Sequence, residues 1–254
     1  MKRIWNVLAE LFFPPSCVGC RTLLNWRCDG ESRVIFCDTC LQKWENERLD
    51  TCGICGRRVT ECACPTEWME QAKCKTFRKL VFYRHGRVDA VQNRLIFHLK
   101  HACVAQTPRF LAAQMTSAVQ EILAACEAEA SQVCITYVPR SRRARAENGV
   151  DQSELLARAL SDEMQLEVRR LILRNRRQNR PQKSLSPLAR LQNAKQSFSI
   201  AKDVSLKGKT VLLLDDIVTT GASMAVCARL LYRAGAREVC CLAVASDDVN
   251  QSRA

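Results

Sequence analysis

Eight cysteines near the amino terminus fall in four close pairs, and their spacing is typical of metal ligands. The spacing Cys-x-x-Cys occurs three times, and the last pair has the spacing Cys-x-Cys. Short turns of this kind aim two thiolates at one point, which suits tetrahedral Zn²⁺. The sequence therefore predicts two structural zinc sites. The ligands of the first are Cys17, Cys20, Cys37 and Cys40, and those of the second are Cys52, Cys55, Cys62 and Cys64.

Two features of this cysteine-rich segment limit what the metal can do. All four positions of each site are filled by protein sulfur, which leaves no open position for water or substrate, so the predicted sites are structural. Little apolar sequence lies between the pairs, so bound metal would act as the core of the segment.

The sequence leaves one ligand of the second site open. Cys74 is the substitute ligand if the spacing of Cys64 is too tight, and Cys28 is left over. The alternatives are reduced core thiols or a redox motif, and the repetition of the pairs favours metal.

A second chemical feature is the acidic pair Asp215 and Asp216, which follows the apolar run 211–214. Two adjacent carboxylates at the end of a buried strand are costly to keep ionised, so they require hydroxyls, a metal or a cation as partners. Residues 219–223 then form a small, hydroxyl-bearing turn at a helix start, where free amides and the helix dipole attract an anion. Together these features predict a site for a phosphorylated sugar. The alternative is simple capping of the helix, with the acids exposed to solvent.

The elements that must position these residues follow from hydrophobic periodicity. Helices are predicted over 108–130, 151–164 and 222–234, and strands over 133–138, 166–173, 210–214 and 239–245. This alternation predicts an α/β fold in which a parallel sheet is flanked by helices. In such sheets ligands bind at the carboxyl ends of the strands, where the acidic pair lies.

Length and composition exclude several classes of protein. The chain has 254 residues, of which 47% are hydrophobic, and this is enough for a buried core in one or two domains. No run approaches the roughly 20 apolar residues that a membrane-spanning helix needs. Residues 1–13 lack a cleavage site for export and instead predict a short amphipathic helix. We therefore expect a cytoplasmic protein with reduced thiols, whose small first domain (1–76) precedes the α/β domain (77–254).

Residues 211–223 resemble the phosphoribosyl pyrophosphate (PRPP) motif of type I phosphoribosyltransferases. They contain, in order, four apolar residues, an acidic pair, two spacer residues and Thr-Thr-Gly-Ala-Ser. With the cysteine pairs before this motif, the chain resembles the competence protein F family, which joins an amino-terminal double zinc ribbon to a type I phosphoribosyltransferase fold. Segments 95–100, 138–139 and 180–182 agree with that family, whereas 147–152 departs from its usual Arg-Gly-Phe-Asn-Gln run.

This resemblance implies roles for individual residues. Asp215 and Asp216 would hold the ribose hydroxyls of PRPP, and the loop 139–142 would lie near its pyrophosphate, accompanied by Mg²⁺. The residues implied to bind the 5′-phosphate are Thr219, Thr220, Gly221, Ala222 and Ser223. If the chain is an enzyme, it would be a phosphoribosyltransferase that works by charge stabilisation, with Asp215, Asp216 and Arg142 as catalytic residues. The family also implies a role in DNA uptake or utilisation during natural transformation, together with other DNA-uptake proteins.

Positive charge indicates a further partner. The net charge is +13, and residues 169–202 contain ten Lys or Arg but no Asp or Glu. A strip of this kind follows a nucleic-acid backbone without reading its sequence, and Phe198 is the only aromatic residue in it. We therefore expect nonspecific binding of single-stranded DNA, the alternative being a solvated basic face. Two further hypotheses are a DNA-binding accessory protein and a PRPP-sensing regulator without transferase activity.

Overall fold

A computed structural model describes residues 14–24, 34–101, 106–141, 149–175 and 196–247 of the chain. Several sequence-based expectations fall outside these ranges. They are the amphipathic helix at 1–13, the spare Cys28, the proposed catalytic Arg142 and most of the basic strip.

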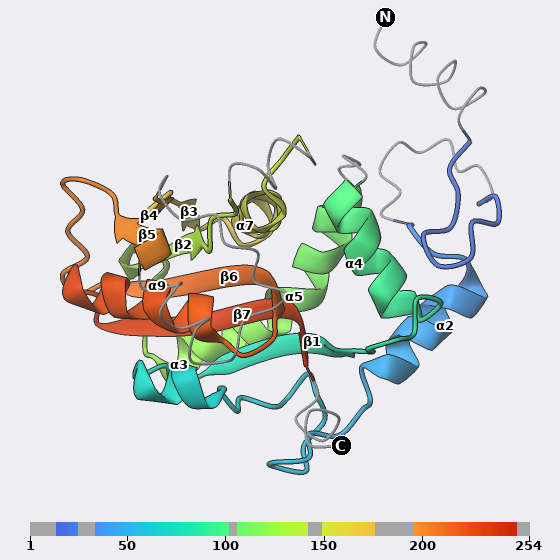
Figure 1. Ribbon diagram of the computed structural model, residues 1–254, viewed down its shortest axis with the longest axis horizontal. Helices are drawn as coiled ribbons and strands as arrows, with labels where there is room; N and C mark the ends of the chain where they lie inside the picture. The colour runs from blue at the N-terminus through green and yellow to red at the C-terminus, as the bar shows by residue number, and fades with distance from the viewer. Residues whose placement is uncertain (1–13, 25–33, 102–105, 142–148, 176–195, 248–254) are drawn as a thin grey trace, which may run out of the picture.

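The centre of the molecule is a parallel five-stranded sheet with the order β1-β7-β6-β2-β3 (Figure 1). Its strands are β1 (Phe77–Tyr83), β2 (Val133–Tyr137), β3 (Glu167–Val168), β6 (Thr210–Val218) and β7 (Glu238–Asp247). The inner strands β6 and β7 are buried along most of their length, because helices cover both faces of the sheet. The predicted α/β fold with a parallel sheet is confirmed, and the edge strand β1 is an element that the sequence analysis did not anticipate.

Helices form a layer on each face of the sheet (Figure 1). One core cluster joins the sheet to α2 (Asp38–Glu47), α4 (Val91–His101), α5 (Gln106–Ala125) and α7 (Gln152–Met164). The opposite cluster joins it to α3 (Glu67–Gln71) and α9 (Ala222–Arg233), and a short 3₁₀ turn, η1 (Ala130–Gln132), precedes β2. The three predicted helices are present as α5, α7 and α9, because their apolar residues recur at the helical period and face the sheet.

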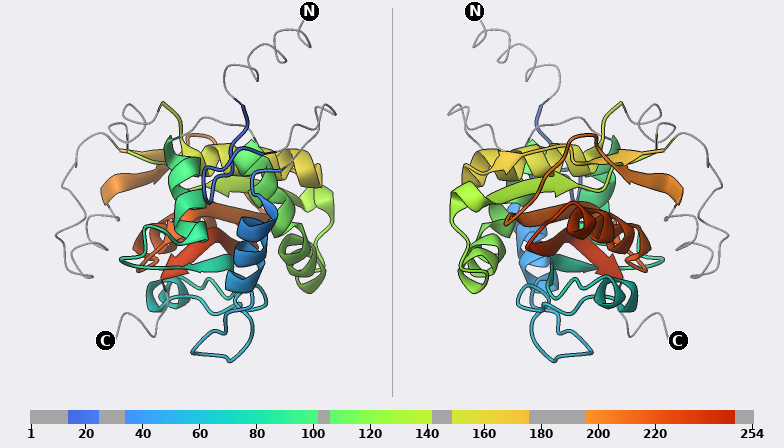
Figure 2. Two further views of the ribbon diagram at one scale, coloured as in Figure 1. Left: turned by 90° about the vertical axis from the view of Figure 1, so that its right-hand side faces the viewer. Right: turned by 90° about the vertical axis from the view of Figure 1, so that its left-hand side faces the viewer.

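The strand predicted over 166–173 is wrong. This stretch forms two short strands in different sheets, β3 in the main sheet and β4 (Ile172–Arg174), which pairs antiparallel with β5 (Phe198–Ile200). The break lies at Arg169 and Arg170, whose charged side chains interrupt the apolar run, and the amide of Leu171 turns back to the carbonyl oxygen of Arg169 at 3.1 Å. Figure 2 shows β4 and β5 at the periphery of the molecule.

The cysteine-rich segment packs directly on the α/β part of the chain. Trp44 of α2 is fully buried, and the ring of Phe36 meets the ring of Phe110 of α5 edge to face at 5.5 Å between centroids. Cys17 and Cys40 belong to the same core cluster. The domain boundary after residue 76 stays a prediction. None of the helices in the described ranges has the length and hydropathy to cross a membrane.

Candidate functional site

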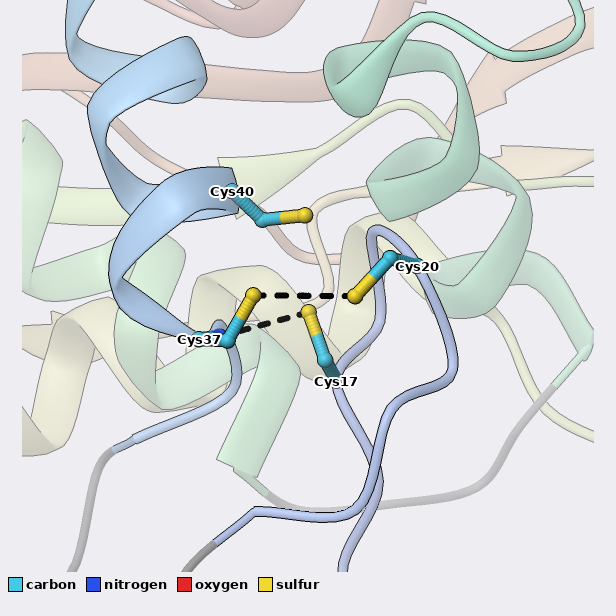
Figure 3. A group of neighbouring side chains, drawn as sticks. All are labelled: Cys17, Cys20, Cys37 and Cys40. Carbon is cyan, nitrogen blue, oxygen red and sulfur yellow. Dashed lines mark hydrogen bonds between the residues drawn. The ribbon is translucent and has the colours of Figure 1, made fainter.

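The first group of cysteines converges as predicted. The Sγ atoms of Cys17, Cys20, Cys37 and Cys40 all lie within 4.8 Å of one another, and the side chains point toward a common centre (Figure 3). The Sγ atoms of Cys20 and Cys37 are 3.6 Å apart, while a tetrahedron with Zn–S bonds of about 2.3 Å places sulfurs about 3.8 Å apart. Gly19 is required in this turn, because a Cβ there would lie 2.6 Å from the Sγ of Cys40. The group can hold a metal ion.

The second group consists of Cys52, Cys55, Cys62 and Cys64, whose sulfurs also lie within 4.8 Å of one another. Cys74 is not the substitute ligand, since it lies in the opposite core cluster and its thiol interacts with Cys241. Burial, followed by the neighbouring sulfurs, raises the pKa of Cys64 to about 12, and the same two causes raise the pKa of Cys40 in the first group. Four thiolates at such a site therefore need a compensating cation, and a divalent metal provides it.

The acidic pair occupies the carboxyl end of β6 and is surrounded by partners. Asp216 is buried and forms ion pairs with the guanidinium of Arg140 and with Lys100, whose Nζ lies 3.6 Å from Oδ2. Asp215 accepts a hydrogen bond from the hydroxyl of Ser153 at 3.0 Å and another from the backbone amide of Asp216 at 2.9 Å. The alternative in which both acids lie exposed in solvent is thus contradicted.

The two carboxyl groups differ in their protonation. Burial, followed by the neighbouring charge of Asp216, raises the pKa of Asp215 well above its ordinary value. Burial also acts to raise the pKa of Asp216, but the adjacent Lys100 and Arg140 outweigh it, so this pKa is lowered. Asp216 therefore carries the negative charge of the pair, and Asp215 more readily holds a proton.

Four elements bring these groups to one edge of the sheet. Lys100 lies in the last turn of α4, Arg140 follows β2, and Ser153 lies in the first turn of α7. Asp151 caps α7, and one of its carboxylate oxygens accepts a hydrogen bond from the backbone amide of Arg140 at 2.9 Å. Sequence reasoning did not assign Lys100 or Ser153 to the site. Two features of the sequence could have indicated them. Lys100 ends the segment 95–100, which resembles the competence protein F family, and Ser153 follows the helix-capping Asp151.

The turn after β6 has the conformation expected of an anion site. Gly221 precedes α9 with φ +78°, a left-handed conformation that favours glycine. Because glycine has no side chain to cap the helix, amides in the first turn of α9 can serve a ligand. Thr219 is exposed, Thr220 and Ser223 are partly exposed, and the Oγ1 of Thr220 accepts a long hydrogen bond of 3.4 Å from the amide of Ala222.

This turn is packed against the segment that follows the second cysteine group. A Cβ on Gly221 would lie 2.1 Å from the Oγ1 of Thr66 and 3.0 Å from the Sδ of Met69 in α3. Thr66 is two residues beyond Cys64. The second cysteine group is thus connected through a short segment to the proposed phosphate turn.

In the basic strip, the structure describes only the two ends. The guanidinium carbon of Arg174 lies 5.0 Å from the centroid of the Phe198 ring, and Phe198 is 4% exposed. The single aromatic residue of the strip is therefore engaged in the protein and does not offer a free face for stacking on a base.

Comparison with known proteins relates the carboxyl-terminal part of the chain to a known domain family. Residues 149–254 match the phosphoribosyl transferase domain family. Over 105 residues the chain is 33% identical to the DNA utilization protein YhgH of Escherichia coli K12, and to that of Shigella flexneri. The alignment covers 41% of this chain and 45% of each relative, so it spans less than half of their length. The predicted resemblance to phosphoribosyltransferases and to competence protein F-like proteins is confirmed over this part.

Two solved structures are also similar to the chain. The first is the allosteric regulatory enzyme of purine biosynthesis, which is 16% identical with a TM-score of 0.36 over 58% of this chain and 30% of that one. The second is adenine phosphoribosyltransferase from Leishmania donovani, which is 16% identical with a TM-score of 0.33 over 56% of this chain and 66% of that one.

Proposed function

We propose that this chain, whose residues 149–254 match the phosphoribosyl transferase domain, binds PRPP at the carboxyl end of β6. The observation that carries the proposal is the acidic pair beside the turn 219–223, with two cations at Asp216. Asp215 and Asp216 would bind the ribose hydroxyls, and the residues of the turn would bind the 5′-phosphate. Arg140 and Lys100 would then turn from Asp216 toward the pyrophosphate, which binds together with Mg²⁺.

If turnover occurs, the reaction is displacement at the anomeric carbon of the ribose. The lone pair of a nucleophile forms a bond to this carbon while the bond from carbon to the pyrophosphate oxygen breaks, and pyrophosphate leaves with the bonding electrons. The transition state carries positive charge on the sugar and negative charge on the leaving group, so fixed charges contribute more than a strong base. Asp216 would stabilise the positive charge on the sugar, and Arg140 and Lys100 would stabilise the leaving group. Arg142, which lies outside the described residues, is proposed for the leaving group from the sequence alone.

Calorimetric titration with PRPP and Mg²⁺ tests the binding site. The double variant Asp215→Asn, Asp216→Asn is expected to lose detectable binding while its zinc content is unchanged. Asp162→Asn, which alters an exposed acid on α7, is the matched control and should bind PRPP as the unaltered protein does. Unchanged affinity in the double variant would overturn the proposed sugar contacts. Release of pyrophosphate from PRPP, with and without single-stranded DNA or cell extract, then distinguishes a transferase from a PRPP-sensing regulator.

A second proposed function is nonspecific binding of single-stranded DNA, in keeping with a role in DNA uptake or utilisation and with other DNA-uptake proteins as partners. It is supported by the net charge of +13, the basic strip, and the curated relatives described as DNA utilization proteins. Charge reversal at Arg176, Arg177 and Arg180 removes up to three phosphate contacts, each worth about 0.7 in the slope of log affinity against log salt. The slope should become shallower by about 2 in the triple variant, whereas charge reversal at the exposed Lys207 should change it by less than about 0.7, the value of one contact. An unaltered slope in the triple variant would contradict DNA binding by this basic strip.

We further propose that both cysteine groups hold structural Zn²⁺. Tetrathiolate zinc would supply the cross-links that a short, weakly apolar segment needs to fold. None of the cysteines in the described ranges forms a disulfide, which is in keeping with the proposed cytoplasmic, reducing compartment. Metal analysis of the purified protein should find two zinc ions per chain, and none would contradict this part of the proposal.

A further inference from the structure

Lys79 of β1 is a buried cation beside the second cysteine group. Lys79 is only 5% exposed, and its Nζ lies 3.1 Å from the Sγ of Cys62. The rings of Phe77 and Phe82 flank the ammonium, with centroids 4.9 Å and 5.9 Å from Nζ. The ammonium is therefore enclosed by aromatic carbon and sulfur.

An ammonium in such a place needs an anion. Removing a charge from water is costly unless the charge is paired, and flanking aromatic faces compensate only in part. Within the described ranges no carboxylate lies at ion-pair distance from Lys79, and the polar atom that its Nζ contacts is the sulfur of Cys62. Among the described residues, the Sγ of Cys62 is thus the group that meets the charge of Lys79, as a ligand of a negatively charged metal site would.

The negative charge of a tetrathiolate zinc site favours a cation beside one of its sulfurs. Four thiolates around Zn²⁺ leave a net charge of 2−, and a hydrogen bond to one sulfur delocalises part of it. The neighbouring Arg78 contacts the same stretch of chain, since its guanidinium donates to the carbonyl oxygens of Glu61 at 2.6 Å and Thr60 at 3.3 Å. Two adjacent cations of one sheet strand therefore hold the Cys62 turn, one through backbone oxygen and the other through the metal-binding sulfur.

The first cysteine group is built differently. The cation described next to it, Arg94, donates to the carbonyl oxygen of Gly19 and not to a sulfur. The sulfurs there meet uncharged groups: the Sγ of Cys20 lies 3.1 Å from the Oγ1 of Thr22, and the backbone amide of Cys37 donates to the Sγ of Cys17 at 3.3 Å. The two groups thus differ in whether a buried cation contacts a ligand.

We infer that Lys79 is a positioning residue of the second metal site: its ammonium holds the Sγ of Cys62 in place as a ligand and fixes the site to the edge of the main sheet. The inference rests on the zinc binding proposed above. If Lys79 has this role, the metal affinity of the second site depends on Lys79 and that of the first site does not. Partners of this kind typically contribute 10- to 100-fold to metal affinity.

Lys79→Met tests the inference, because methionine fills similar space without a charge or a donor. We expect zinc to leave one of the two sites about 10- to 100-fold faster into the chelator 4-(2-pyridylazo)resorcinol, with the other site unchanged. In the cobalt-loaded protein, the sulfur-to-metal charge-transfer band of one site should shift, which a purely structural role would not cause. Lys79→Arg, which keeps the charge and the donor, should restore slow release, and Lys75→Met, at an exposed lysine just before β1, is the matched control.

The outcomes separate the inference from the zinc proposal. If the unaltered protein contains no zinc, the zinc proposal fails and the inference with it. If the unaltered protein contains two zinc ions and Lys79→Met releases both at the original rates with an unchanged cobalt spectrum, the inference alone is overturned. Should Lys79→Met fail to fold, Lys79→Gln is compared with Lys79→Arg, and equal release rates in these two variants would overturn the role of the charge.

Discussion

Replacement of Gly221 by alanine probes the contact between the proposed phosphate turn and α3. Two costs can be estimated from the structure. A residue with a Cβ at φ +78° costs about 1 to 2 kcal/mol in the left-handed region. The new Cβ would also lie 2.1 Å from the Oγ1 of Thr66 and 3.0 Å from the Sδ of Met69, and forced overpacking typically costs about 1 to 3 kcal/mol. Gly221→Ala should therefore destabilise the fold by about 2 to 5 kcal/mol.

Gly208→Ala is the matched control for the backbone cost. Gly208 has a similar φ of +75°, and a Cβ there would meet nothing within 4 Å, so only about 1 to 2 kcal/mol is expected. Urea unfolding followed by far-UV circular dichroism gives the stabilities of both variants. Thr66→Ala in the Gly221→Ala background removes the clashing oxygen and should recover at least about 1 kcal/mol as a coupling energy.

The same variants connect the turn to binding. Gly221→Ala displaces the turn and should weaken PRPP binding in calorimetry, whereas Gly208→Ala lies before β6 and should not. Equal destabilisation by Gly221→Ala and Gly208→Ala, with no coupling to Thr66, would refute the packing of α3 on this turn.

Three further predictions concern the acids and the metal groups. Asp216→Asn should lower the free energy of unfolding at pH 7 by about 3 to 5 kcal/mol, measured by urea denaturation, because Arg140 and Lys100 lose their buried partner. Asp215→Asn should be neutral or stabilising at pH 7, since the raised pKa of Asp215 makes its ionised form costly in the fold. The stability difference between the variant and the unaltered protein should grow as the pH rises from the ordinary acid range, and it should vanish at low pH, where Asp215 is protonated in both the folded and the unfolded state. A stability difference that is constant across pH would contradict this prediction. Gly19→Ala, which would place a Cβ 2.6 Å from the Sγ of Cys40, should reduce zinc from two ions per chain to one, and a retained count of two would contradict the close packing of that turn.

Much of the α/β fold could be predicted from local pattern. The helices α5, α7 and α9 carry their apolar residues at the helical period. The strands β2, β6 and β7 each contain an apolar run, such as 211–214 in β6 and 239–245 in β7, so each of these elements is encoded in a short stretch of sequence. The edge strand β1 was missed because Arg78 and Lys79 interrupt its apolar pattern. The side chains of both residues contact the cysteine-rich segment, and such tertiary contacts cannot be predicted from local hydrophobic periodicity.

The site was predictable to a smaller extent. The acidic pair and its turn are contiguous, so residue type and order were sufficient to find them. Lys100 and Ser153 come from separate helices and meet Asp216 and Asp215 only in the folded chain. The choice between Cys64 and Cys74 was open for the same reason, because only the folded chain brings Cys64 to the second cysteine group and Cys74 to a different core cluster.

A crystal structure of the protein with PRPP and Mg²⁺ bound would show directly whether the sugar phosphate binds at the carboxyl end of β6. We expect the ribose hydroxyls at the carboxylates of Asp215 and Asp216 and the 5′-phosphate in the turn 219–223, with Arg140 released from Asp216. Density for PRPP at another surface, or an Arg140–Asp216 pair that persists with the sugar elsewhere, would contradict it.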